Sequence, residues 1–158
     1  MKIDDMHSLF SKSSGISTDT RTIKKNNIFF CLKGEKFDGN LFIDQAFHLG
    51  ASFVIYDDEK LNYKSEKAIK VKNVLKTLQA LAKYHRSKFN IPVIGLTGSN
   101  GKTTSKELIN SVLSQKFNVT FTSNNFNNHI GVPLTILKIN RKTDIAIIEM
   151  GANHLGEI

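Results

Sequence analysis

The stretch Thr-Gly-Ser-Asn-Gly-Lys-Thr-Thr at residues 97–104 constrains the fold of this chain more than any other segment. It follows an apolar run at residues 91–96 and leads directly into a helix-like sequence. A buried strand that passes through two glycines into a helix is typical of a phosphate-binding loop. Such loops lie beyond the carboxyl ends of strands in parallel sheets. The segment therefore predicts an α/β fold with an anion site in this loop.

Each residue type in the loop has a physical role. Gly98 and Gly101 allow backbone angles that other residues resist, and they leave amide groups open to a ligand. Lys102 adds a positive charge where the β- and γ-phosphates would lie, and the Thr103 hydroxyl can hold Mg²⁺. The strict Walker pattern requires glycine at position 96, which is Leu96 here, so the loop is a shorter variant. The alternative is a strand-to-helix turn with an incidental lysine.

A second apolar strand, predicted at residues 144–151, carries Glu149 near its end. This carboxylate would lie at the ligand-binding edge of the expected sheet. There it could bind the same Mg²⁺ directly or through water, because Mg²⁺ prefers oxygen ligands and keeps several waters. The alternative is an exposed carboxylate at a strand end.

Strand-like and helix-like segments alternate along the chain, which favours parallel sheets covered on both faces. The predicted strands are residues 26–32, 51–56, 91–96, 117–122 and 144–151. The predicted helices are residues 4–10, 41–50, 73–89 and 102–115. The segments 33–40, 57–72 and 123–133 are predicted to be loops or connections.

The composition is typical of a soluble globular protein, with 40% hydrophobic and 23% charged residues among 158. The net charge of +8 comes from scattered lysines that form no tight basic block with interleaved aromatic residues, which favours anionic small molecules over nucleic acid. The N-terminus has no signal-peptide pattern, and no apolar run approaches the length of a membrane span. We therefore expect a cytoplasmic protein that does not insert into membranes.

Two residues with reactive side chains have ordinary structural interpretations. Cys31 is the single cysteine, so no internal disulfide can form, and we expect a core residue in a reducing compartment. His85 lies on the apolar face of the predicted helix 73–89. No second metal-type residue lies at matching spacing, so we expect a hydrogen-bonded histidine rather than a metal ligand.

These motifs together resemble the Mur ligases, ATP-dependent enzymes that add amino acids to the peptidoglycan precursor. The loop at residues 97–104 is similar to their ATP-binding loop, and residues 17–55 resemble their N-terminal UDP-binding domain. The segments NNFNNHIGVPLTIL (124–137) and IIEMGANHLGEI (147–158) look like the members that add the final dipeptide. The resemblance covers nearly the whole chain.

The resemblance implies an α/β fold with a UDP-substrate-binding domain at residues 1–88 and an incomplete ATP-binding domain at residues 89–158. It implies ATP and Mg²⁺ as cofactors, and UDP-N-acetylmuramoyl-tripeptide and D-alanyl-D-alanine as substrates of a monomer. ATP would phosphorylate the tripeptide carboxylate, and the amine of the dipeptide would then displace phosphate.

Site residues follow from the resemblance position by position. ATP-binding residues would be Gly98, Ser99, Asn100, Gly101, Lys102, Thr103 and Thr104, with Lys102 and Glu149 catalytic and Thr103 and Glu149 holding Mg²⁺. Substrate-binding residues would be Thr18, Asp19, Thr20, Arg21, Gly34, Asp38, Gly39, Asn40, Asn127 and Asn128. Many of these are asparagine, aspartate and glycine, which also favour ordinary turns.

Members of the family run to several hundred residues. The adenine-binding elements, the carbamylated lysine that binds a second Mg²⁺, and the C-terminal domain have no counterpart in these 158 residues. We therefore expect that the chain alone does not complete ligation. Three alternatives stay open: the ligase that adds the third residue, a folylpolyglutamate synthase, and a nucleotide-binding module without catalysis. The element at Asn127 and Asn128 argues against the first two.

Overall fold

The computed structural model describes residues 1–35 and 37–151. Contacts divide the chain into two compact units, Met1–Leu81 and Ala82–Ile158. Each unit combines helices with a parallel sheet, so the α/β class predicted from the sequence is confirmed. The predicted domain boundary after residue 88 stays a prediction.

The first unit is built on a four-stranded parallel sheet with the order β1-β2-β5-β6. These strands are β1 (Ile16–Ser17), β2 (Ile28–Phe30), β5 (Phe53–Tyr56) and β6 (Ala68–Lys70). In register, Phe29 lies opposite Val54, and Ile55 lies opposite Ile69. All three residues of β2 are fully buried, as expected for an apolar strand inside a parallel sheet.

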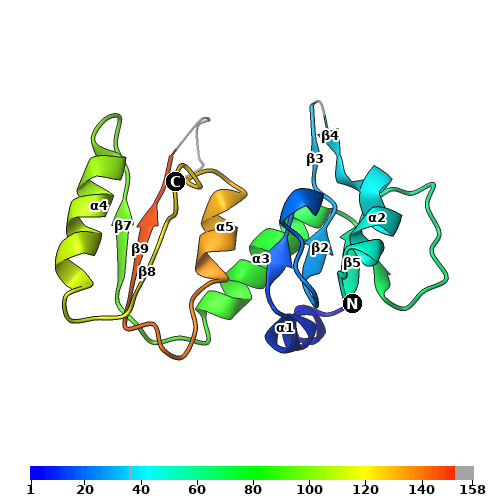
Figure 1. Cartoon of the computed structure of the whole chain (residues 1–158), viewed down its shortest axis with the longest axis horizontal. Coiled ribbons are helices and arrows are strands. Elements are labelled where there is room, and N and C mark those ends of the chain that lie inside the picture. Colours follow the sequence, from blue (N-terminus) through cyan, green and yellow to red (C-terminus); the bar gives the residue numbers. More distant parts are fainter. Residues whose placement is uncertain (36, 152–158) are drawn as a thin grey trace. The chain divides into compact units, whose positions relative to one another are not determined.

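Short helices and one hairpin complete the first unit (Figure 1). The elements are α1 (Ile3–Lys12), the 3₁₀ helices η1 (Thr20–Thr22) and η2 (Gly39–Phe42), α2 (Ile43–His48), and the antiparallel pair β3 (Lys33–Gly34) and β4 (Phe37–Asp38). Ile43 and Ala46 of α2 pack with Phe29, Val54 and Tyr56 in the core. The amphipathic pattern of α2 therefore buries one face against the sheet.

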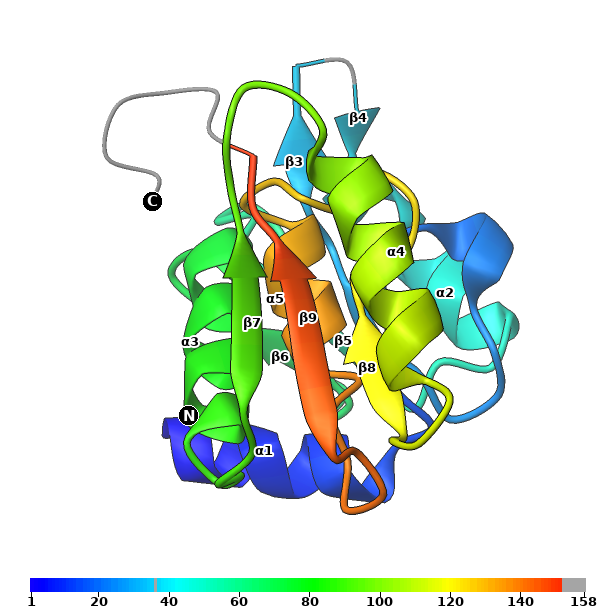
Figure 2. The ribbon, with the colours of Figure 1, turned by 90° about the vertical axis from the view of Figure 1, so that its left-hand side faces the viewer.

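The second unit holds a three-stranded parallel sheet with the order β7-β9-β8. Its elements are β7 (Val93–Leu96), α4 (Lys102–Leu113), β8 (Val119–Phe121), α5 (Gly131–Ile136) and β9 (Ile145–Glu149). Figure 2 shows α4 in front of this sheet and α5 behind it, so the two helices cover opposite faces. Ala146 and Ile148 of β9 pack with Ile139 in the core behind the central strand.

Helix α3 (Val74–Arg86) contains the sequence boundary between the two units. Val74, Leu78 and Leu81 are buried, as the helical spacing predicted. The buried His85 ring has its Nε2 2.7 Å from the carbonyl oxygen of Ile139, so the prediction of a hydrogen-bonded histidine is confirmed.

Several local predictions need correction. Residues 57–72 are not only a connection, because they contain β6, whose short apolar part Ala68-Ile69 lies among charged residues. The predicted loop 123–133 ends in the first turn of α5, where Pro133 is tolerated because its missing N–H would lack an intrahelical acceptor there. The loop predicted at residues 33–40 contains the β3–β4 hairpin, and β1 was not predicted at all.

Cys31 is fully buried, as expected for a core residue, and burial raises the pKa of its thiol to about 12. Such a thiol is not a nucleophile at neutral pH.

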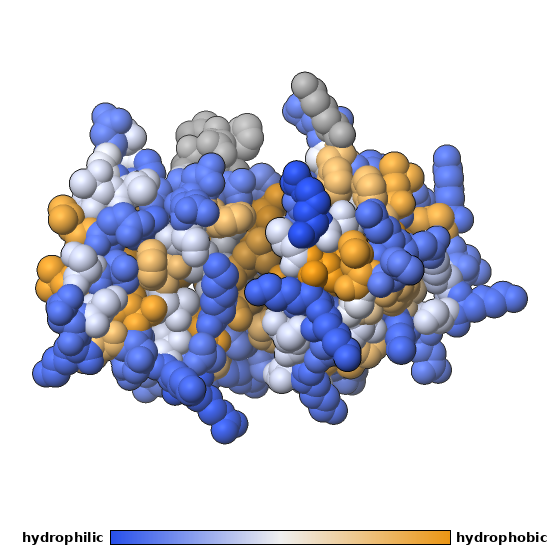
Figure 3. Space-filling model, in the orientation of Figure 1, coloured by the Kyte–Doolittle hydropathy of each residue, from blue (hydrophilic) through white to orange (hydrophobic). Residues whose placement is uncertain are grey.

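Apolar side chains are also exposed along the outer side of α4 (Figure 3). Leu108 is 63% exposed and Val112 is 70% exposed, one helical turn apart. None of the helices in the described residues is long and apolar enough to cross a membrane.

Candidate functional site

The loop between β7 and α4 has the backbone shape that its glycines predicted. Gly98 has φ +135° and Gly101 has φ +75°, angles that L side chains rarely adopt. A Cβ atom added at either position would meet nothing within 4 Å. Backbone conformation rather than crowding therefore requires glycine at these two positions, and the space beside them is open.

The first turn of α4 points unsatisfied amide groups toward this loop. Gly101 is the N-cap residue, and no side chain caps the helix. The first intrahelical bond there runs from the Ser105 amide to the Gly101 carbonyl, so the amides of residues 102–104 have no acceptor within the helix. An anion bound at this end would receive these donors and the positive end of the helix dipole.

Lys102 lies over the loop backbone. Its Nζ donates to the carbonyl oxygen of Gly98 at 2.5 Å. This bond keeps the ammonium group beside the open space where an anion would meet the amides. The exposed residues Ser99 and Asn100 complete the bend.

Glu149 lies next to the start of α4 because of strand register. β7 and β9 are parallel neighbours, and Leu96 lies opposite Glu149, so both strands end at the same level. The Thr103 hydroxyl donates to Glu149 Oε1 at 3.2 Å. Glu149 is only 1% exposed, so the alternative of an exposed strand-end carboxylate is wrong.

Two further residues hold Glu149 in place. Asn127 Nδ2 donates to Oε1 at 2.9 Å, and the Glu149 amide donates to Thr122 Oγ1 at 2.9 Å. The carbonyl of Asn127 also accepts from the Gly151 amide at 2.7 Å. Asn127, which the resemblance assigned to the substrate, therefore contacts the predicted metal ligand in this structure.

Asn128 has a different place. Its Oδ1 accepts from the amides of Ile130 and Gly131 at 3.1 and 2.8 Å. These bonds form an Asx turn just before α5, an ordinary structural role of asparagine. Asn128 could therefore serve to shape the turn before α5 rather than to bind substrate.

The donor set at Glu149 suits Mg²⁺. Oε2 of Glu149 is buried and, within the described part of the chain, has no hydrogen-bond partner. A carboxylate oxygen and the Thr103 hydroxyl are hard ligands of the kind that Mg²⁺ takes beside water and phosphate oxygens. Residues 1–35 and 37–151 contain no cluster of three or more His, Cys, Asp or Glu side chains that could hold a metal. The ion would therefore depend on Glu149, Thr103, water and a bound phosphate.

The sequence did not single out Lys106, which the structure places at the same carboxylate. Its side chain is completely buried, and its Nζ lies 3.6 Å from Glu149 Oε2. A lysine within a polar helical run such as Ser-Lys-Glu normally extends into solvent. The local sequence therefore gave no sign that Lys106 is buried. Its position one turn after Lys102, on the helix face that meets β9, was the available clue.

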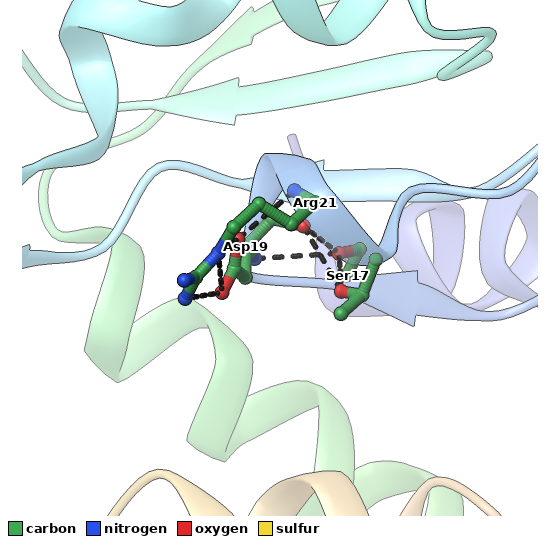
Figure 4. A network of polar contacts seen from close by, with 4 residues as sticks. Ser17, Asp19 and Arg21 are labelled. Carbon is green, nitrogen blue, oxygen red and sulfur yellow. Dashed lines mark hydrogen bonds and ion pairs between the residues drawn. The ribbon is translucent and has the colours of Figure 1, made fainter.

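The predicted substrate residues Thr18 to Arg21 lie at the start of η1, where Figure 4 shows the polar contacts of Ser17, Asp19 and Arg21. Asp19 accepts from the Arg21 amide at 2.9 Å and from Arg21 Nη2 at 2.5 Å. Hydrogen bonds from the Arg21 side chain and amide lower the pKa of Asp19. Ser17 Oγ lies 2.9 Å from Thr22 Oγ1 and donates to the Asp19 carbonyl at 2.7 Å. The flanking Thr18 and Thr20 are partly exposed.

The other predicted substrate residues of this unit lie in the β3–β4 hairpin and in η2. Asp38 is paired with Lys33 at 3.0 Å and accepts from the side chain of Asn40 at 2.7 Å. Burial acts to raise the pKa of Asp38, but hydrogen bonds from Lys33 and Asn40 outweigh it and lower the pKa. Gly34 is exposed, whereas the buried Gly39 has no room for a side chain.

Comparison with known proteins identifies relatives for both units. Residues 12–86 match the model described as "Mur ligase family, catalytic domain", and residues 96–157 match the "Mur ligase middle domain". The Bacillus subtilis protein named UDP-N-acetylmuramoyl-tripeptide–D-alanyl-D-alanine ligase is 46% identical over 145 residues, which are 91% of this chain and 32% of that protein. The chain thus spans about a third of the length of the curated relatives it matches.

Two solved structures are similar in fold as well as sequence. The crystal structure of MurF from Acinetobacter baumannii has a TM-score of 0.82 at 35% identity, covering 92% of this chain and 32% of that one. The MurF ligase from Thermotoga maritima, solved in complex with ADP, has a TM-score of 0.83 at 32% identity, covering 100% and 35% respectively.

Proposed function

Since this chain belongs to the Mur ligase family, we propose that it carries part of a ligase that joins D-alanyl-D-alanine to UDP-N-acetylmuramoyl-tripeptide with ATP. The curated relatives bearing that name, at 32–46% identity, support this substrate pair over the alternatives of third-residue addition and folylpolyglutamate synthesis. The ADP complex of the Thermotoga maritima relative supports nucleotide use.

The observation that carries the proposal is the pairing of an open glycine loop with a buried carboxylate. Amides at the start of α4 are free to bind phosphate, and Thr103 joins that helix to Glu149 through a 3.2 Å hydrogen bond. An anion site and a hard-cation site thus share one helix end, which is what binding of a nucleoside triphosphate with Mg²⁺ requires.

The chemistry of ligation explains why these groups are needed. A carboxylate is a poor electrophile, so transfer of the γ-phosphoryl group makes an acyl phosphate that the dipeptide amine can attack. The amides of residues 101–104 would hold the phosphates in line. The Lys102 ammonium would exchange its hydrogen bond with the Gly98 carbonyl for one with the transferring phosphoryl group, whose negative charge it would offset. When bound, Mg²⁺ supplies charge neutralisation between the phosphates. Glu149 and Thr103 would hold that ion.

The first unit is proposed to bind the uridine end of the precursor. Its candidates are the segment Thr18 to Arg21 and the residues Gly34, Asp38, Gly39 and Asn40. In this proposal residues 1–88 form the UDP-substrate domain, and residues 89–158 belong to the ATP-binding domain of a monomer. The buried, unpaired Cys31 agrees with a reducing compartment, so a cytoplasmic location is part of the proposal.

A binding experiment on the 158-residue chain tests the nucleotide site. Titration with Mg-ATP, followed by amide hydrogen exchange, should show protection of residues 98–104. UDP should give protection at residues 18–21 and 34–40 instead. Absence of protection at the glycine loop in folded protein would remove the basis of the ligase proposal.

A product assay tests the reaction. The 158-residue chain should release neither ADP and phosphate nor UDP-N-acetylmuramoyl-pentapeptide. A polypeptide of full family length containing it should release all three with D-alanyl-D-alanine. Preference for a single amino acid or for glutamate as acceptor would favour one of the rival ligases.

A further inference from the structure

Lys106 is a completely buried lysine on α4, a helix whose outer side is exposed. Lysine is almost never fully buried unless its charge is paired, because transfer of an ammonium group out of water is costly. Because water cannot solvate the Lys106 ammonium, neighbouring groups of the protein must compensate its charge.

The surroundings of its Nζ are specific. The ammonium lies 3.1 Å from Glu107 Oε1, 3.4 Å from the Asn124 carbonyl oxygen and 3.6 Å from Glu149 Oε2. The Phe121 ring of β8 closes another side, with its centroid 5.9 Å away. Lys106 thus lies between one exposed carboxylate, that of Glu107, and one buried carboxylate, that of Glu149.

The two oxygens of Glu149 are not equivalent. Oε1 accepts from Thr103 and Asn127. Oε2 is buried, has no hydrogen bond to any described residue, and faces the ammonium at ion-pair distance. Because Oε2 accepts no hydrogen bond from the described residues, a lone pair of this oxygen is available to a divalent cation. A metal ion and the ammonium would therefore act on the same oxygen.

We propose that Lys106 is a positioning residue that serves as the internal counter-cation of Glu149 and makes binding of the divalent ion depend on the nucleotide. The ammonium holds the buried carboxylate in place before the metal arrives and repels a divalent ion that comes alone. Phosphate oxygens of a bound nucleotide supply the ligands and negative charge that overcome this repulsion. Glu107 keeps the ammonium paired when the metal binds Oε2. The inference rests on the proposed nucleotide site.

Manganese binding to the 158-residue chain, measured by electron paramagnetic resonance at pH 8, tests this role. Without nucleotide, Lys106→Met should bind Mn²⁺ at least about tenfold more tightly than the unaltered chain, because a positive charge a few ångströms from the ligand atom is gone. With ATP present the difference should shrink. Lys106→Arg, which keeps the charge, should resemble the unaltered chain.

Two controls separate this effect from general charge and from folding. Lys116→Met removes an exposed positive charge from the same unit and should leave Mn²⁺ affinity unchanged. The double variant Lys106→Met with Glu149→Gln should lose the tight site. If Lys106→Met alone does not fold, its circular dichroism should recover on addition of Mn²⁺ but not of monovalent salt.

Equal Mn²⁺ affinity in Lys106→Met and the unaltered chain, or an unfolded variant that Mn²⁺ does not restore, would overturn the inference. After either result the unaltered chain can still bind Mn²⁺ together with ATP, which would leave the proposed function intact. Failure of the unaltered chain to bind Mn²⁺ even with ATP would instead count against the proposed function itself.

Discussion

The two candidate binding regions differ in how their charged groups are satisfied. In the first unit, Asp19 pairs with Arg21 and Asp38 pairs with Lys33, and both cations are largely exposed. In the second unit, Glu149 and Lys106 are buried together, and one carboxylate oxygen has no hydrogen bond within residues 1–35 and 37–151. The carboxylates of the first region are thus paired without a ligand. Among the described residues of the second, one acceptor has no hydrogen bond and the first amides of α4 have no acceptor within the helix.

This difference indicates what each region can do. Surface ion pairs contribute little to stability and exchange readily with water or ligand groups, so the first region is suited to reversible recognition. A buried carboxylate with an uncommitted oxygen is costly to maintain, and such sites are typically functional. We therefore expect substitutions in the second region to affect chemistry, and those in the first to affect binding or folding.

The largest expected effect is on phosphoryl transfer. In a ligase of full family length containing this chain, Lys102→Ala should lower turnover on the order of 10²–10³-fold, by analogy with loss of one preorganised donor. Binding of UDP to the first unit should be unchanged in the same variant. Lys142→Ala, at an exposed position of the same unit, should keep normal turnover. Near-normal turnover of Lys102→Ala would contradict the role given to this lysine.

The next largest expected effect concerns close packing at Gly39 in the first region. A Cβ at Gly39 would lie 2.7 Å from the Cα of Cys31, so Gly39→Ala should destabilise the first unit by about 1–3 kcal/mol through overpacking. Gly34→Ala is the matched control, because a Cβ there meets nothing within 4 Å and should change stability by less than about 0.5 kcal/mol. Urea unfolding of both variants measures the difference. If Gly39→Ala and Gly34→Ala have equal free energies of unfolding, the backbone around residue 39 can shift to accommodate a methyl group at little cost.

A smaller effect concerns pH and the second unit. Burial lowers the pKa of His85 below its ordinary value of 6.5, against the opposing hydrogen bond at the Ile139 carbonyl. The unfolded chain takes up this proton near pH 6.5, while the folded chain resists it. Stability should therefore fall as pH drops below 6.5, until the pH passes the lower pKa of the folded state. Thermal unfolding of His85→Gln should lack this component of the pH dependence.

The smallest effect concerns the pair at Asp19. Its pKa lies below the ordinary 3.8 because of hydrogen bonds from Arg21, so its contribution is present above pH 3.8 and is lost as pH falls through the lower folded value. Arg21→Gln should return the pKa of Asp19 toward 3.8 in a carboxyl-carbon NMR titration, with little change in stability. Lys33→Gln should leave Asp19 unaffected. A strong loss of stability in Arg21→Gln would mean that this pair is structural.

The sequence predicted the elements that carry strong patterns. The apolar run before Gly98 predicted β7, and helical spacing predicted the buried face of α3 through Leu78 and Leu81. The glycine loop was identifiable because its chemistry lies in one continuous stretch.

Other features could not be predicted because they depend on contacts between distant segments. The strand β6 has a short apolar core, Ala68-Ile69, and is defined by its pairing with β5. The contact of Asn127 with Glu149 joins segments 22 residues apart. Burial of Lys106 depends on β8, β9 and the Asn124 loop closing over α4, which no local pattern of a lysine encodes.

The alignment of β9 with β7, described above through Leu96 and Glu149, also limits how such a chain can change over evolution. Side chains alternate between the two faces of a strand, so one inserted residue within 145–149 would turn the carboxylate to the opposite face. The exposed residues 140–142 carry no such restriction, since extra length there is absorbed at the surface. Insertions and deletions should therefore accumulate before the strand, while its five-residue length stays fixed.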